Sequence, residues 1–164
     1  MYRSFLVVAC AAATAALLSG CVPGNYRPNA GAATAELTLV RGAMHLGARS
    51  LQVYAGYRDA HCSAGPGNGR LAALLTYTKT EKTAAVEAGR RLYVVAGLRN
   101  YSVRQGTCLN IVSFVPQPQH RYEAIQDETA RYPCTLRVVD RADGSPPPDL
   151  TVEDARNCPG KAVE

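Results

Sequence analysis

Three side chains of types that often bind metals lie close together in the first half of the chain: Asp59, His61 and Cys62. A carboxylate, an imidazole and a thiolate can hold a zinc ion, and a thiolate beside a histidine can act as a nucleophile. The same residues also suit a turn whose cysteine is oxidised, and a disulfide sulfur is neither a ligand nor a nucleophile. Because no cysteine forms a C-x₂-C pair and no second cluster completes a coordination shell, we predict no metal, no cofactor and no catalytic residue.

The other patterns that resemble enzyme motifs are weaker. The glycine-rich residues 65–70 lack the Gly-Lys-Ser/Thr ending of a phosphate-binding loop and the helix that follows one. Glu123 and Asp127 flank Ile125 on one strand face, which would suit a glycosidase pair but also a half-exposed surface strand. His120 is expected to be a solvated loop residue. We therefore predict that the protein is not an enzyme.

Arginine and tyrosine side chains supply the best signal for an interaction surface. A guanidinium group binds carboxylate or phosphate through paired hydrogen bonds, and tyrosine is frequent in interfaces. We predict such a surface around one strand and the loop after it, formed by Arg90, Arg91, Arg99, Tyr101 and Arg104. An anionic glycan, a lipid headgroup or an acidic protein would fit it. Ordinary solvated arginines are the plain alternative.

The elements that must position these residues read as strands. Leu51, Val53, Ala55 and Tyr57 alternate with Gln52, Tyr54 and Gly56, and period-two patterns of this kind recur along the chain. The segments are 36–39, 51–57, 71–79, 83–87, 91–96, 108–115, 121–127 and 134–140. Even spacing predicts an all-β fold, an antiparallel β-sandwich of about seven to eight strands. Ala88-Gly89 and residues 116–119 are interpreted as hairpin turns.

Cysteine chemistry predicts how this fold is stabilised. Cys62, Cys108, Cys134 and Cys158 form an even set, which outside the cytoplasm predicts two disulfides. Three pairings are open. We favour Cys62–Cys108 with Cys134–Cys158, because the second bond would hold a proline-rich C-terminal segment. Loop-closure entropy would give roughly 3.5–4 kcal/mol for each bond, before strain.

The N-terminus reads as an export signal. Arg3 precedes an apolar run at residues 5–18, which is shorter than the ~20 residues a membrane-spanning helix needs. The run ends in Leu18-Ser19-Gly20-Cys21, which resembles a bacterial lipobox. The resemblance implies a diacylglyceryl group on the Cys21 sulfur, cleavage before Cys21 and acylation of the new amine. Val7-Val8-Ala9-Cys10 also fits loosely, but it leaves too few residues for a charged region and an apolar core.

This resemblance also implies a location. The chain is similar to small uncharacterised proteobacterial lipoproteins with a β-sandwich domain, on the residues Val86, Ala88-Gly89, Cys108, Phe114-Val115-Pro116, Tyr122 and 134–138. Val22 stands where an aspartate would signal retention in the inner membrane, so the resemblance implies an outer-membrane lipoprotein that faces the periplasm. We expect a cleaved signal peptide at 1–20, a lipidated flexible tether at 21–35 and the sandwich at 36–160.

A shorter similarity points to another pairing. Tyr132 precedes Cys134 by two residues, as in the tyrosine corner of immunoglobulin variable domains, which would pair Cys62 with Cys134. The chain has no tryptophan, which those domains need in their core, so we treat the match as a coincidence.

Composition sets the limits of the functional prediction. A hydrophobic content of 47% excludes wholesale disorder, and the lack of a second long apolar run excludes a polytopic membrane protein. The net charge is +5, but nucleic acid is not expected as a partner in the envelope. We predict a membrane-anchored envelope lipoprotein that acts as a non-enzymatic interaction or structural module. The alternatives are a periplasmic binding module for an anionic glycan or lipid headgroup, and an accessory subunit of a secretion or assembly machine.

Overall fold

The computed structural model describes residues 24–42, 50–75, 80–100, 107–127 and 134–158. Their strands are β1 (Thr34–Arg41), β2 (Ser50–Tyr57), β3 (Gly69–Leu75), β4 (Glu81–Glu87), β5 (Leu92–Asn100), β6 (Thr107–Phe114), β7 (Arg121–Asp127), β8 (Thr135–Asp140) and β9 (Thr151–Glu153), and a 3₁₀ turn, η2 (Ala155–Asn157), follows β9. The all-β prediction is therefore confirmed. Nothing helical in the described segments is long and apolar enough to cross a bilayer.

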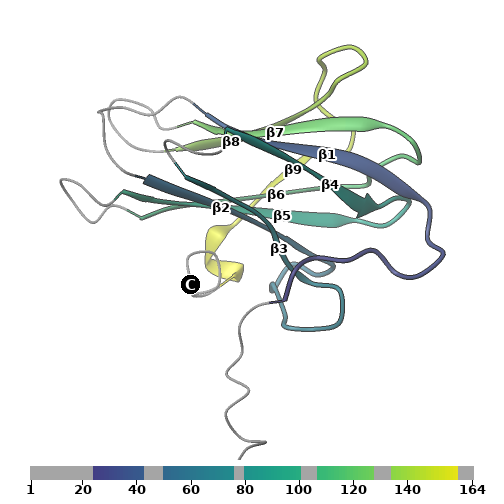
Figure 1. Cartoon of the computed structure of the whole chain (residues 1–164), viewed down its shortest axis with the longest axis horizontal. Coiled ribbons are helices and arrows are strands. Elements are labelled where there is room, and N and C mark those ends of the chain that lie inside the picture. The colour runs from purple at the N-terminus through teal and green to yellow at the C-terminus, as the bar shows by residue number, and fades with distance from the viewer. Residues whose placement is uncertain (1–23, 43–49, 76–79, 101–106, 128–133, 159–164) are drawn as a thin grey trace, which may run out of the picture.

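The strands form two sheets that lie on each other as the layers of a sandwich (Figure 1). Sheet A has the order β3-β2-β5-β6-β9, and sheet B has the order β4-β1-β7-β8. The pairs are antiparallel except for β1 and β7, which run parallel. The prediction missed only β9, because its three residues follow a run of prolines and are too few for a period to show.

Both expected hairpin turns connect different sheets instead. Ala88-Gly89 leads from β4 in sheet B to β5 in sheet A, and residues 116–119 lead from β6 in sheet A to β7 in sheet B. The N–H of Gly89 donates to the carbonyl of Pro116 at 2.8 Å, so the two crossings support each other. Turn residues specify that the chain reverses, but the partner of the next strand depends on tertiary packing, and here the prediction was wrong.

The main core lies between the sheets and consists of alternate side chains from both. Leu37, Leu39, Tyr54, Val94 and Phe114 are fully buried there, and the ring of Phe114 meets that of Tyr122 edge-on at 5.0 Å. Each such side chain contributes about 1.5–3 kcal/mol through its removal from water.

The inner face of β2 is the more polar of its two faces. Gln52 and Tyr54 face sheet B and are completely buried. The Gln52 amide donates to the Gln126 carbonyl at 2.8 Å, and the Tyr54 hydroxyl donates to the Val40 carbonyl at 2.8 Å. Because the main chain supplies these partners, the sandwich accommodates polar side chains in its interior.

The two disulfides have neither the favoured pairing nor the immunoglobulin-like one. Cys108 in β6 is joined to Cys134 just before β8, which links the two sheets, and Cys62 is joined to Cys158 after η2. The Cα atoms are 6.0 and 5.2 Å apart, respectively. The four cysteines are disulfide-bonded as predicted, but the partners were wrong because sequence order does not show which loops the fold brings together.

The Cys62–Cys158 bond belongs to a second apolar cluster on the outer face of sheet A. Ala55, Val95 and Ile111 form this cluster with the two cysteines and Tyr57. Sheet A is therefore covered on both faces at the end where β2 leads into β3.

The folded domain includes residues before Glu36, from Gly24 onward in the described part of the chain. The N–H of Tyr26 donates to the Arg70 carbonyl at 3.0 Å, the N–H of Arg70 donates to Gly24 at 2.9 Å, and the Tyr26 ring is buried in the main core. Residues 24–35 are thus part of the domain where we predicted a flexible tether, because one aromatic side chain finds a core site and the main chain pairs with β3. The signal peptide and Cys21 lie outside the described residues.

Candidate interaction site at the crossover end of the sandwich

The structure describes three of the predicted arginines, and it does not bring these three together. Arg90 and Arg91 precede β5, whereas Arg99 is near its other end, beside Leu51 of β2. At about 3.3 Å per residue, Arg91 and Arg99 are roughly 26 Å apart along the strand. They are far apart because a strand is extended, so that the distance between two of its residues grows by the full rise per residue. Tyr101 and Arg104 lie outside the described residues, as does the side chain of Arg99.

Arg91 joins two segments of the domain through hydrogen bonds. Its guanidinium donates to the Ser113 hydroxyl and to the Asp149 carboxylate, each at 3.0 Å. The same carboxylate accepts the N–H of Val115 at 3.0 Å. Arg91 therefore connects the segment before β9 to the end of β6. Because its guanidinium group already donates to Ser113 and Asp149, fewer of its N–H groups are available to a ligand.

Arg90 belongs to a cluster around a buried carboxylate. Glu87 is 6% exposed, and its carboxylate accepts hydrogen bonds from Arg58 at 3.1 Å and from the N–H of Asn29 at 3.3 Å. Arg90 lies 3.5 Å away on the solvent side. Burial by itself would raise the pKa of Glu87, but these donors hold it below its ordinary value. The cluster joins the N-terminal segment to β4, which is a structural task.

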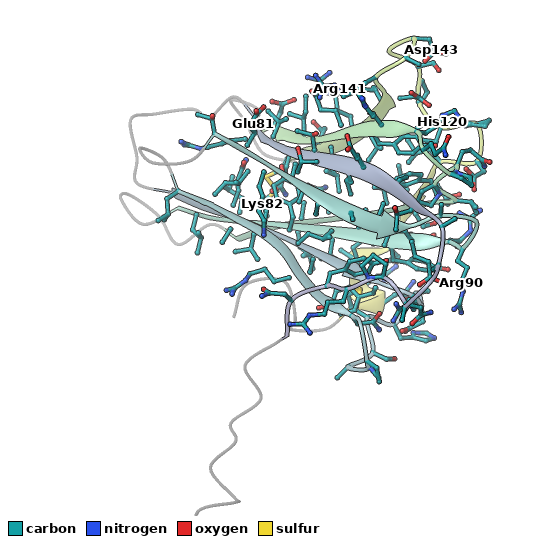
Figure 2. All side chains as sticks on the ribbon, turned by 45° about the vertical axis from the view of Figure 1, so that its right-hand side comes forward. Glu81, Lys82, Arg90, His120, Arg141 and Asp143 are labelled. Carbon is teal, nitrogen blue, oxygen red and sulfur yellow. A yellow bond between two sulfur atoms is a disulfide. The ribbon has the colours of Figure 1, made fainter. Side chains whose placement is uncertain are left out.

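A different group of polar residues surrounds an open pocket of about 500 Å³ on the sheet B side of the same end. It forms where β7 begins beside the end of β8, and its walls are Gln119, His120, Arg121, Asp140, Arg141 and Ala142. Figure 2 shows His120, Arg141 and Asp143 together on this side, with Arg90 lower at the same end. The sequence predicts only that His120 is a solvated loop residue, because its neighbours in the pocket come from the pairing of β7 with β8.

A short hydrogen bond organises the pocket. Nδ1 of His120 lies 2.7 Å from the Asp140 carboxylate, which also accepts the N–H of Ala142 at 2.9 Å. The Ala142 N–H and the His120 imidazole hold the pKa of Asp140 below its ordinary value. The imidazole is thus fixed through one nitrogen, while half of its surface stays open to solvent.

Two guanidinium groups flank this pair. Arg121 is largely exposed and lies 3.5 Å from the carboxylate of Glu36. The N–H of Arg141 donates to the Arg121 carbonyl at 2.8 Å, so the main-chain positions of the two arginines are adjacent at the edge of the pocket. An imidazole and two guanidinium groups at an open pocket can bind a carboxylate, sulfate or phosphate group.

The residues considered for metal or enzyme chemistry have other tasks. The Asp59 carboxylate accepts the main-chain N–H groups of His61 and Ser63 at 3.0 and 3.2 Å, which closes the turn that carries Cys62. No group of three or more metal-ligating side chains occurs in the described segments. Asp127, of the suggested carboxylate pair, lies 3.4 Å from Arg137 on the outer face of sheet B.

The comparisons with known proteins add no relative. No family model matches the chain, and a search of curated proteins finds no match either.

Proposed function

We propose that this chain is a bacterial envelope lipoprotein, anchored through acylated Cys21, whose β-sandwich acts as a non-enzymatic interaction module. The proposal rests on which cysteines form disulfides. The two disulfides engage all four cysteines after residue 21, so the cysteine that remains after signal cleavage is the one at the lipobox. Two structural disulfides also agree with an oxidising compartment.

The crossover end is the end of the sandwich where residues 88–89 and 116–119 pass between the sheets. Its polar groups support an interaction role over catalysis. Glu87, Asp149 and Asp59 are each engaged by several internal donors, which fixes loops in place. The pocket beside His120 is open and exposed, as a recognition surface is, whereas catalytic groups work best where water is excluded.

Fractionation of cells that produce the full-length chain tests the anchor. Wild-type protein is expected in the membrane pellet, and Cys21→Ser protein is expected in the periplasmic extract with both disulfides formed. The matched control is Cys10→Ser, which removes the competing lipobox cysteine and should leave the protein in the membrane. A Cys21→Ser protein that has lost residues 1–20 and still stays in the membrane pellet would overturn the anchor.

A second function, binding of an anionic glycan or headgroup, is favoured by the pocket beside His120. Charge-assisted hydrogen bonds are worth about 1.5–3 kcal/mol, so loss of the Arg141 guanidinium should weaken binding of an anionic wall fragment roughly tenfold or more. Calorimetry with soluble cell-wall fragments would measure this, with Arg137→Ala on the outer face of sheet B as control. Absence of heat at millimolar fragment would rule this function out.

A further inference from the structure

The folded domain starts very close to the anchoring cysteine. Only three peptide steps separate Cys21 from Gly24, the first described residue. A fully extended chain of that length reaches about 10 Å. If Cys21 is lipidated as proposed above, on which this inference rests, the domain cannot move freely above the membrane. One part of its surface must stay within about 10 Å of the headgroups.

The position of Gly24 shows which part this is. Its carbonyl accepts the N–H of Arg70 at 2.9 Å, at the start of β3. β3 is an edge strand of sheet A, and the described chain begins on the sheet A side of the sandwich (Figure 1). The attachment point is therefore at the β3 edge of sheet A, three residues or roughly 10 Å along the strand from Ala73.

The outer face of sheet A carries apolar side chains that no described element fully covers. The strand register aligns Ala73, Val53, Gly97 and Leu109 across β3, β2, β5 and β6. In the next row Leu75 lies beside Leu51, and this row continues to Arg99 of β5. Leu75 is 51% exposed, Ala73 is exposed, and Leu51, Val53 and Leu109 are half-buried. We call Leu51, Val53, Ala73, Leu75 and Leu109 the apolar face of sheet A.

The outer face of sheet B is mostly polar, although Val40 lies beside Ile125 within it. Its rows pair Glu36 with Arg121 and bring Thr83, Thr38 and Glu123 side by side. Arg137 and Asp127 complete a polar surface that is suited to water. The two outer faces of the sandwich therefore differ in polarity, and the apolar one lies on the side where the chain leaves for Cys21.

We propose that the apolar face of sheet A rests on the surface of the membrane that holds Cys21. Leu75 and Ala73 would enter the boundary between headgroups and acyl chains, as apolar faces of interfacial proteins do. Arg27 and Arg70 are exposed beside Gly24 and would bind lipid phosphates there. The short connection keeps the local concentration of this face at the membrane high, so a weak intrinsic affinity suffices.

The absence of tryptophan from the chain provides a clean test. A single tryptophan is placed at Ala73 or, as the matched control, at Ala85; both are exposed alanines on edge strands, one in each sheet. The full-length acylated proteins are reconstituted in phosphatidylglycerol–phosphatidylethanolamine vesicles that contain phosphatidylcholine brominated high on the acyl chain. The fluorescence of Ala73→Trp should fall at least twofold more than that of Ala85→Trp. Adding Leu75→Glu should remove most of this difference.

The possible outcomes separate this inference from the proposed function. Protein that floats with the vesicles but shows equal quenching at both positions would overturn the docking and leave the anchor intact. An Ala73→Trp probe shielded from both bromolipid and aqueous acrylamide would show that another part of the chain covers this face, and would also overturn the docking. If the protein purified from cells carries no acyl group and does not float with the vesicles, the anchor itself is contradicted.

Discussion

At the scale of single residues, the most informative side chain is Glu87. Its buried carboxylate receives donors from the segment before β1, from the end of β2 and from the turn after β4. The hydroxyl of Tyr26 also accepts the N–H of Glu87 at 3.2 Å, and the Arg58 guanidinium lies over the Tyr26 ring. A buried charge is tolerated here because several donors surround it, and removing the charge should leave those donors unpaired.

Glu87→Gln is therefore expected to lower the free energy of unfolding at pH 7 by about 2 kcal/mol, the scale of hydrogen bonds to a charged group. The folded-state pKa lies below the ordinary value of 4.5, so the carboxylate stabilises the fold above that pH. This contribution disappears as the pH falls through the folded-state pKa. Urea unfolding of both proteins at pH 7 and pH 3 measures the effect.

The control for this prediction is Glu36→Gln, because Glu36 pairs with Arg121 on an exposed surface. It should change the free energy of unfolding by less than about 1 kcal/mol. A difference between Glu87→Gln and wild type that is as large at pH 3 as at pH 7 would contradict the assigned role of the charge.

At the scale of elements, the sequence predicted the strands well and their partners poorly. The period-two patterns located eight of the nine strands in the described segments, because alternation depends only on neighbouring residues of one strand. The pairing depends on distant contacts. Ala88-Gly89 looks like a hairpin turn, yet β4 lies beside β1 and β5 beside β2. The candidate site shows the same limit, since His120 and Asp140 become neighbours only through the pairing of β7 with β8.

Cysteine pairing leads to a prediction about elements. The Cys62–Cys158 bond closes a loop of 96 residues and the Cys108–Cys134 bond a loop of 26. Loop-closure entropy predicts losses of about 4.7 and 3.5 kcal/mol when each pair is replaced by alanine. Denaturant unfolding of the two double variants should thus show the larger loss for Cys62→Ala/Cys158→Ala. Peptide mapping of the wild-type protein that recovered Cys62 linked to Cys108 would contradict the pairing.

The N-terminal segment provides a second prediction at this scale. Because the Tyr26 ring fills a core site, Tyr26→Ala should destabilise the domain by about 3 kcal/mol and expose the segment. Hydrogen exchange of the Arg27 amide, which donates to the Gly67 carbonyl, should accelerate at least tenfold, whereas Tyr26→Phe should keep most of the protection. Rapid exchange of the Arg27 amide in the wild-type protein would show that this segment belongs to the flexible tether that the sequence predicts for residues 21–35.

At the scale of the whole molecule, the chain is a sandwich with two unlike outer faces. Sheet B presents mostly charged and hydroxyl side chains and a pocket at one end, whereas sheet A presents an apolar face along β3, the strand that also pairs with Gly24. An anchor at Cys21 would orient both faces. Sheet A would lie toward the membrane, and sheet B with the His120 pocket would face partners. Composition could not reveal this difference, because the hydrophobic content and the net charge are the same for any arrangement of the strands.

The most direct test of this account is the intact mass of the protein extracted from membranes. We predict a chain that begins at Cys21 and is heavier than its amino acids by one diacylglyceryl group and one amide-linked acyl chain, with the extra mass on the N-terminal peptide. Four fewer hydrogens than the reduced chain would report the two disulfides. A chain that keeps residues 1–20, or one that begins elsewhere and carries no acyl group, would contradict the anchored lipoprotein and the membrane orientation that depends on it.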